Sequence, residues 1–200
     1  MYNRCTMTTS SQTQQCLLKA FAGESQARNK YFTFAKMARK EGLEWIARVF
    51  EETADNERTH AEELFEMIKG EISVPNITLD IHAYSTNTVE NLKTAAAGEK
   101  YEWTTMYPDF EKIAIAEKEV EPARLFGQLK KVEEKHEERY IILAKHLDSK
   151  TLYDQNTEFE WKCVNCGYIH RGKTPPAKCP VCQKPKEWYM PLGLVRECIP

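Results

Sequence analysis

Between about Ser11 and Leu147, apolar residues recur at helical spacing among Glu, Lys, Arg and Ala. This periodicity is typical of amphipathic helices that bury one face. Glycines interrupt the pattern at Gly42 and Gly70. Because glycine is favoured just beyond helix C-termini, these two positions are predicted to end a first and a second helix.

The second half of this segment carries its own helix signals. Asn87 and Glu90 resemble a capping box for a third helix, and Pro122 suits the first turn of a fourth. Pro108 falls inside the third helix and is expected to kink it. Residues 71–87 are too long for a tight hairpin and suit a crossover between two helix pairs. Two antiparallel hairpins joined by one crossover form the ferritin-like arrangement.

The residue composition changes after Leu147, where the helical periodicity ends and Thr, Tyr, Trp, Cys, Gly and Pro become frequent. The expected fold class is therefore mainly α, with a four-helix bundle followed by a small loop-rich domain. The boundary is predicted near Ser149, which gives a bundle over residues 1–148 and a second domain over residues 149–200.

Composition excludes several classes of protein. A formal net charge of −2 with interspersed signs offers no basic surface for nucleic acid or an anionic membrane. The N-terminal residues lack a signal-peptide core, and no stretch approaches the length of a membrane helix, so a soluble cytoplasmic protein is expected. In that setting seven cysteines favour metal binding over disulfides.

Glutamates occupy the predicted buried face of every helix. An isolated buried carboxylate is costly, so one in each of four helices indicates a shared partner, and a metal is the simplest. The residues concerned are Glu24 in the first helix, Glu57 and His60 in the second, Glu99 and Glu102 in the third, and Glu133 and His136 in the fourth.

These positions also agree in height along the bundle. Glu24 and Glu57 are nearly equidistant from the turn at Gly42, and the two halves of the segment repeat the same order of Glu and Glu-x-x-His. A single Glu-x-x-His is more simply a solvated helix face. At matched heights, however, the set has the pattern of di-iron carboxylate bundles. Oxygen ligands with two imidazoles favour iron or manganese.

Cys163, Cys166, Cys179 and Cys182 form two Cys-x-x-Cys pairs separated by twelve residues. Four thiolates at this spacing can converge on one ion, although the spacing alone does not separate iron from zinc. A zinc ribbon for partner recognition therefore remains an alternative. Surrounding aromatic residues and Gly167, beside a predicted two-metal site, favour iron. The other cysteines lack a partner at ligand spacing and are expected to be free thiols: Cys5, Cys16 and Cys198.

Several segments together resemble the rubrerythrin family. They are AFAGESQARNKY (20–31), ERTH (57–60), AAGEKYEWTTMYP (96–108), EEKH (133–136), and CVNCGYIHRG with CPVC in the tail. The resemblance implies a ferritin-like bundle with a rubredoxin-like domain. It implies two irons held by the seven Glu and His residues named above. It also implies one iron held by the four cysteines of the two Cys-x-x-Cys pairs, or knuckles, which are called the knuckle cysteines below. Gln183 departs from free rubredoxins, which usually carry Gly there.

The resemblance also implies an activity. The chain would be a non-haem peroxidase that reduces hydrogen peroxide to water, with electrons passing through the four-cysteine iron from a rubredoxin or an NAD(P)H-linked reductase. One iron would take Glu102 when ferric and His60 when ferrous. Tyr31 and Tyr107 would bond ligand carboxylates, although buried aromatics with other acceptors are an equal alternative. The family further implies a homodimer or higher even oligomer, in which the cysteine domain of one chain approaches the di-iron site of another.

Other functions remain open at this stage. A ferroxidase or iron-storage protein also uses a di-iron bundle, but the appended electron-transfer domain weighs against it. Superoxide reduction usually needs a histidine-rich mononuclear site, which the sequence lacks.

Overall fold

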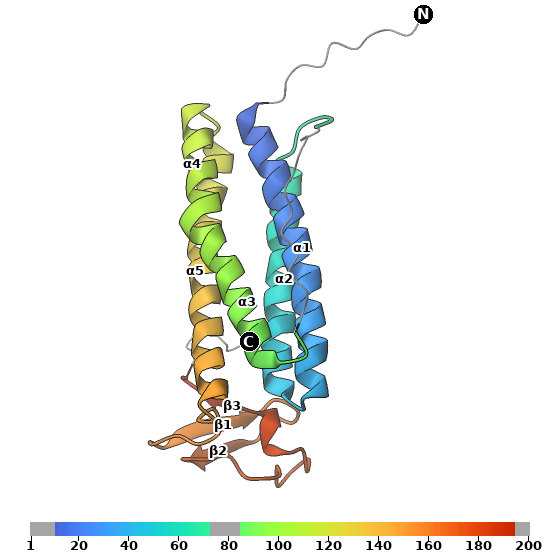
Figure 1. The fold of residues 1–200 in the computed structure, drawn as a ribbon, viewed down its shortest axis with the longest axis vertical. Coiled ribbons are helices and arrows are strands. Elements are labelled where there is room, and N and C mark those ends of the chain that lie inside the picture. The colour runs from blue at the N-terminus through green and yellow to red at the C-terminus, as the bar shows by residue number, and fades with distance from the viewer. Residues whose placement is uncertain (1–10, 73–84, 195–200) are drawn as a thin grey trace, which may run out of the picture.

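The computed structural model describes residues 11–72 and 85–194. It contains a long helical bundle with a small sheet domain at one end (Figure 1). Within the described residues, no helix combines the length and apolar character that a membrane span requires. The helical elements of the bundle are α1 (Gln12–Lys40), α2 (Glu44–Glu66), α3 (Thr88–Tyr101), a π-helical turn (Glu102–Met106), α4 (Tyr107–Ala116) and α5 (Val120–Asp148).

The helices form two pairs. Helices α1 and α2 lie side by side as one hairpin, whereas α3, the π-helical turn and α4 run together as one long helix beside α5 (Figure 1). The four predicted helices are therefore present, with the third in three parts. The predicted crossover falls largely on residues 73–84, which lie outside the described residues.

Local signals in the sequence explain most helix ends. Gly42 has a φ of 83° between α1 and α2, a conformation that glycine adopts without steric cost. Helix α2 ends at Glu66, before Gly70 is reached. At the start of α3, the Asn87 side chain accepts a hydrogen bond from the N–H of Glu90 at 3.1 Å. The second hydrogen bond of a capping box, from the Asn87 N–H to the Glu90 side chain, is not formed. The Asn87 N–H donates to Ser85 Oγ at 3.0 Å instead.

Pro108 was expected to kink the third helix, and the structure places the π-helical turn directly before it. The N–H of Tyr107 reaches back to the carbonyl of Glu102, one residue further than in an α-helix. Pro108 has no N–H to continue the α-helical ladder. The wider turn shifts the phase of the following residues, and Tyr107 is fully buried.

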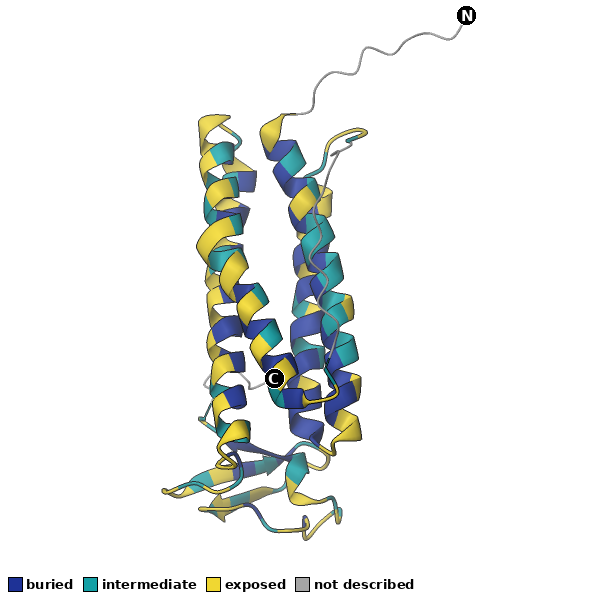
Figure 2. Cartoon of the chain, viewed as in Figure 1, coloured by how far each residue is buried: buried dark blue, intermediate teal, exposed yellow. Residues whose placement is uncertain are grey.

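Two apolar clusters fill the bundle, and buried positions line its inner faces (Figure 2). The cluster nearer the sheet domain includes Tyr31, Phe50 and Tyr140. The cluster at the far end includes Leu17 and Phe126. In all four helical segments the predicted glutamates fall in sequence between members of the two clusters, so a polar layer separates two apolar ones.

The second domain is built on a three-stranded antiparallel sheet. Its elements are β1 (Phe159–Cys163), β2 (Ile169–Gly172), a 3-10 turn (Lys186–Trp188) and β3 (Tyr189–Leu192), with β1 between the other two strands. Trp161 is fully buried at the centre, and its indole N–H donates to the carbonyl of Gly172 at 2.8 Å.

This domain packs against the end of the bundle. Leu152 and Met190 belong to the same apolar cluster as the bundle residues. Arg48 of α2 donates a hydrogen bond from Nη1 to the carbonyl of Val164 at 2.8 Å. The guanidinium of Arg48 also lies 5.6 Å from the ring centroid of Trp188.

Candidate metal centres

The predicted ligands converge on the polar layer of the bundle. Regular helical spacing on α2 and α5 turns each Glu-x-x-His pair toward the same side, because residues three apart share a helix face. The side chains that converge are buried in every case: Glu24 from α1, Glu57 and His60 from α2, Glu99 from α3, and Glu133 and His136 from α5.

One group of potential ligands surrounds Nδ1 of His60. This atom lies 2.8 Å from Glu57 Oε2, 3.2 Å from Glu133 Oε1 and 3.9 Å from Glu24 Oε2. One ligand atom from each of these four residues lies within 4.8 Å of the others. The four side chains therefore form a compact set of three carboxylates and one imidazole.

A second group surrounds Nδ1 of His136 in the same way. This atom lies 2.8 Å from Glu133 Oε2, 3.3 Å from Glu57 Oε1 and 4.0 Å from Glu99 Oε1. The two imidazole rings are 6.1 Å apart. Glu57 and Glu133 belong to both groups, each presenting one oxygen to either side. Two adjacent metal ions could be held here, and Glu57 and Glu133 would be shared between them.

Most polar atoms of the layer have no hydrogen-bond partner, so metal ions could bind them. Both carboxylate oxygens of Glu57 and Glu133 are buried without a hydrogen-bond partner in the described structure, as is Nδ1 of both His60 and His136. Buried polar atoms without partners are rare and costly. Cations would satisfy them, and the oxygen-rich donor set with two imidazoles suits iron.

Two tyrosines form hydrogen bonds with the two carboxylates that the groups do not share, Glu24 and Glu99. The hydroxyl of Tyr31 donates to Oε1 of Glu99, and the hydroxyl of Tyr107 donates to Oε1 of Glu24. Each tyrosine comes from the helix opposite its glutamate, so the contacts tie α1 to the third helix in both directions. Both rings are buried. In each case the remaining Oε2 is left without a hydrogen-bond partner.

Crowding of charges alters the ionisation of the metal-free layer. Burial raises the pKa of Glu24 to about 8. Burial also opposes charge on the imidazoles, but the neighbouring carboxylates outweigh it. They raise the pKa of His136 to about 10 and that of His60 far above its ordinary value. The two histidines in turn lower the pKa of Glu57 to about 2 against the effect of burial. The layer therefore holds protons that metal ions would displace.

Glu102 is the one predicted ligand that lies outside both groups. It is half-buried and belongs to the π-helical turn, one turn beyond Glu99. Burial raises its pKa well above the ordinary value, and Glu24 is the carboxylate that adds most to this shift.

The four knuckle cysteines form a separate cluster in the second domain. Their Sγ atoms lie within 4.8 Å of one another, with 3.6 Å between Cys163 and Cys182 and between Cys166 and Cys179. A tetrahedron with metal–sulfur bonds of about 2.3 Å has edges of about 3.8 Å. Cys163 and Cys179 are buried, whereas Cys166 is exposed. The cluster therefore fits one tetrahedral ion near the surface.

The cysteine of α1 differs from the knuckle cysteines. Cys16 is a buried free thiol, and burial raises its pKa to about 11. It is therefore protonated at neutral pH and poorly nucleophilic. Cys5 and Cys198 lie outside the described residues.

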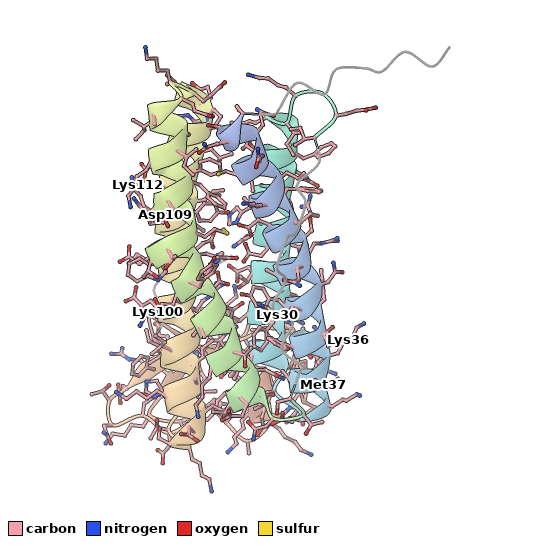
Figure 3. The ribbon with its side chains drawn as sticks, turned by 45° about the horizontal axis from the view of Figure 1, so that its top comes forward. Lys30, Lys36, Met37, Lys100, Asp109 and Lys112 are labelled. Carbon is pink, nitrogen blue, oxygen red and sulfur yellow. The ribbon has the colours of Figure 1, made fainter. Side chains whose placement is uncertain are left out.

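Two neighbours of the polar layer carry no signal in the sequence. The side-chain amide of Asn56 lies 3.3 Å from Nε2 of His136. Lys30 of α1 lies at a level similar to that of Lys100 of α3 (Figure 3), with its ammonium 5.1 Å from the Tyr31 ring centroid. A Cβ at Gly98 would lie 3.3 Å from this ammonium, so the glycine leaves room for it. Only the fold brings these residues to the site.

Comparison with known proteins agrees with this geometry. The family model described as Rubrerythrin matches residues 15–144, and the model described as Rubrerythrin, rubredoxin-like domain, matches residues 161–190. A rubrerythrin of Porphyromonas gingivalis is 44% identical over 183 residues, which cover 91% of this chain and 90% of that protein. The chain belongs to the rubrerythrin family. A rubrerythrin of Nitratidesulfovibrio vulgaris is 41% identical, over 92% of this chain and 96% of that protein.

Solved structures give the same result for the fold. A mixed-valence nigerythrin aligns with a TM-score of 0.61 and 33% identity, over 96% of this chain and 92% of that one. A bacterioferritin of Rhodobacter capsulatus aligns with a TM-score of 0.63 at 20% identity, over 72% of this chain and 89% of that one. This second likeness concerns the fold alone. The expected ferritin-like bundle with a rubredoxin-like domain is confirmed.

Membership of the rubrerythrin family makes the chain a di-iron protein with an appended four-cysteine iron domain, of the oxidoreductase class. The two carboxylate and histidine groups supply candidate sites for the iron pair. The knuckle cluster supplies the candidate site for the single iron.

Proposed function

We propose that this member of the rubrerythrin family is a non-haem peroxidase that reduces hydrogen peroxide to water in defence against oxidative stress. The observation that carries the proposal is that one chain holds both a two-ion carboxylate and histidine layer and a four-cysteine cluster. When bound, a ferrous pair supplies the two electrons that peroxide needs, and the four-cysteine iron restores them one at a time. The reaction consumes one peroxide, two protons and two electrons, and yields two waters.

In this proposal the two groups of the polar layer are the iron ligands. Glu57 and Glu133 hold both ions, because each presents one oxygen to either group. The remaining ligands differ between the two ions. The first ion is held by Glu24 and His60, and the second by Glu99 and His136.

Glu102 has a separate role in the proposal. It lies outside both groups, one turn beyond Glu99, and it and His60 would serve as alternative ligands of one ion. The carboxylate suits the harder ferric ion. Tyr31 and Tyr107 orient the carboxylates of Glu99 and Glu24, respectively.

Electrons enter in this proposal through the exposed side of the knuckle cluster. Cys166 is exposed, and Val181 beside Cys182 is 66% exposed, so a partner can approach the sulfurs closely. A rubredoxin or an NAD(P)H-linked reductase of that type is the proposed donor. A homodimer or higher even oligomer would allow the cysteine domain of one chain to serve the iron pair of another.

Anaerobic stopped-flow spectroscopy tests the activity. Fully reduced, iron-loaded protein is mixed with one equivalent of hydrogen peroxide and, in parallel, with air-saturated buffer. Peroxide is expected to oxidise the cysteine iron quickly through the bundle, and oxygen much more slowly. Glu57→Ala is expected to remove the fast phase, whereas Glu134→Ala is not, because Glu134 is an exposed residue beside the layer.

Three outcomes would contradict the peroxidase proposal. If peroxide and oxygen react alike, or if the cysteine iron stays reduced, a ferroxidase or storage function takes its place. If metal analysis finds zinc in the knuckle cluster as isolated, the second domain is a binding module without a redox cycle.

A further inference from the structure

The two candidate histidine ligands differ in what lies behind them. Both His60 and His136 point Nδ1 at the carboxylates. Nε2 of His136 lies 3.3 Å from the side-chain amide of Asn56, whereas Nε2 of His60 has no hydrogen-bond partner among the residues that the structure describes. The two halves of the polar layer match closely in their carboxylates. They differ in the residue that contacts Nε2 of the histidine, on the side of the ring away from the carboxylates.

The internal repeat of the bundle explains this inequality. Asn56 directly precedes Glu57 on α2, and the counterpart of Glu57 on α5 is Glu133. The residue that directly precedes Glu133 is Val132. The repeat thus replaces an amide with an isopropyl group, which can neither donate nor accept a hydrogen bond. The difference between the two halves therefore comes from two corresponding positions of the sequence, Asn56 and Val132.

The contact of Asn56 has a defined chemical consequence when a metal is bound. A metal on Nδ1 leaves the imidazole proton on Nε2. The N–H at Nε2 of His136 then donates to Oδ1 of Asn56, once the amide is turned by 180° from the assigned orientation. Such a turn exchanges two atoms that look alike and changes no packing. A hydrogen bond of this kind fixes the plane of the ring and raises the basicity of the ligand.

We propose that Asn56 is a positioning residue that anchors His136, and that Val132 leaves His60 without an equivalent anchor. The inference rests on the proposed function in taking both histidines as iron ligands. The anchored imidazole stays on its ion throughout the reaction cycle. The unanchored imidazole turns more freely, and it is the one that the proposed function pairs with Glu102 as alternative ligands of one ion. Asn56 thereby determines which of the two ions keeps its ligands and which exchanges them.

NMR of the diferrous protein tests the anchor without any peroxide. The probe is the exchange with solvent of the two imidazole N–H protons, whose signals are shifted by the iron and assigned with a His60→Ala variant. In the unaltered protein the His136 proton is expected to exchange more slowly than the His60 proton, by about fivefold or more. A merely structural role of Asn56 would not protect one ring proton selectively.

Three variants sharpen the test. Asn56→Val is expected to bring the His136 proton to the fast exchange of His60, and Asn56→Asp, which keeps an acceptor, to preserve the slow exchange. Asn56→Val is also expected to weaken binding at one of the two ferrous sites by about 10-fold to 100-fold. Val132→Asn is expected to slow the His60 proton, and Val132 is half-buried, so the larger polar side chain can reach solvent.

The possible results separate clearly. Equal exchange of the two protons in the unaltered protein, or an unchanged His136 proton in Asn56→Val, would overturn the anchor. An unchanged His60 proton in Val132→Asn would overturn the part assigned to Val132. Thermal unfolding of the metal-free variants checks that the bundle is intact. Because no peroxide is added, failure of the peroxidase proposal leaves these results unaffected.

Discussion

The hydroxyl of Tyr107 donates a hydrogen bond to the carboxylate of Glu24, across the bundle from α4 to α1. Tyr107→Phe would leave Oε1 of Glu24 buried without its partner. The expected result is a decrease in the free energy of unfolding of about 1–3 kcal/mol, measured by chemical denaturation of the metal-free protein. Tyr101→Phe is the matched control, because Tyr101 is 58% exposed and should change stability little. Equal stability of the two variants would contradict the prediction.

Binding of two ferrous ions should release protons at pH 7. The raised pKa values of His60 and His136 mean that both imidazoles are protonated in the metal-free layer, whereas metal binding requires them neutral. Release of about two protons or more per chain is expected, and the apparent affinity should fall as the pH falls. A pH indicator in weakly buffered solution measures the release. Binding that is independent of pH would contradict this ionisation pattern.

Gln183 is predicted to destabilise the second knuckle. Its φ is 60°, a left-handed conformation that is costly for a residue with a Cβ. Its N–H donates to the carbonyl of Cys179 at 2.9 Å, as the N–H of Gly167 does to Cys163 in the first knuckle. Gln183→Gly should stabilise the cysteine domain by about 0.5–1 kcal/mol.

The paired variant for this prediction is Gly167→Ala, which should destabilise the domain by a similar amount because Gly167 has a φ of 79°. Thermal unfolding followed at the visible absorbance of the cysteine iron measures both. A loss of stability in Gln183→Gly would mean that its side chain contributes more than its backbone costs.

Arg48 is predicted to couple the two parts of the chain. Its hydrogen bond to the carbonyl of Val164 and its position over the Trp188 ring join α2 to the knuckles. Arg48→Ala should speed hydrogen exchange of the Val164 amide, which donates to the Trp188 carbonyl at 2.8 Å. Arg58→Ala is the control, since Arg58 pairs on the same helix with Glu62. Unchanged exchange in Arg48→Ala would show that apolar packing alone holds the domain.

The sequence alone predicted the buried faces of α2 and α5 well. Phe50 and Leu64 lie seven residues before and after Glu57 on α2, and Phe126 and Leu143 lie seven residues before Glu133 and after His136 on α5. This helical spacing predicts that they share the face of the ligands, and all four are buried. These helices are regular, so one period describes their whole length. Their Glu-x-x-His pairs could be located for the same reason.

The third helix was less predictable. An α-helical period that runs through Glu99 and Glu102 predicts Met106 as the next buried position, but the structure buries Tyr107 fully and leaves Met106 half-buried. A π-helical turn adds one residue to the repeat, and the local sequence contains no residue that requires it. The resemblance to a known family, and not the periodicity, identified Tyr107 as a partner of the site.

On α1, helical spacing about Glu24 predicts Phe21 and Arg28 on the buried face, but both are only half-buried. The Phe21 ring packs on Phe65 of α2, with 5.3 Å between the ring centroids. Two small residues, Ala20 and Ala27, are buried on α1 instead. The contact of Asn56 could not be found from its neighbours either, since only the fold brings it to His136.

Glu57 and Glu133 each present one oxygen to either metal position, so the two ions would share two of their ligands. The first ion to bind would draw two mutually repelling carboxylates together from α2 and α5 and thereby prepare both for the second. Loading of the pair should consequently be positively cooperative. Chains that hold a single ion would then be scarce at every stage of a titration, and iron starvation would divide the population into empty and fully loaded molecules.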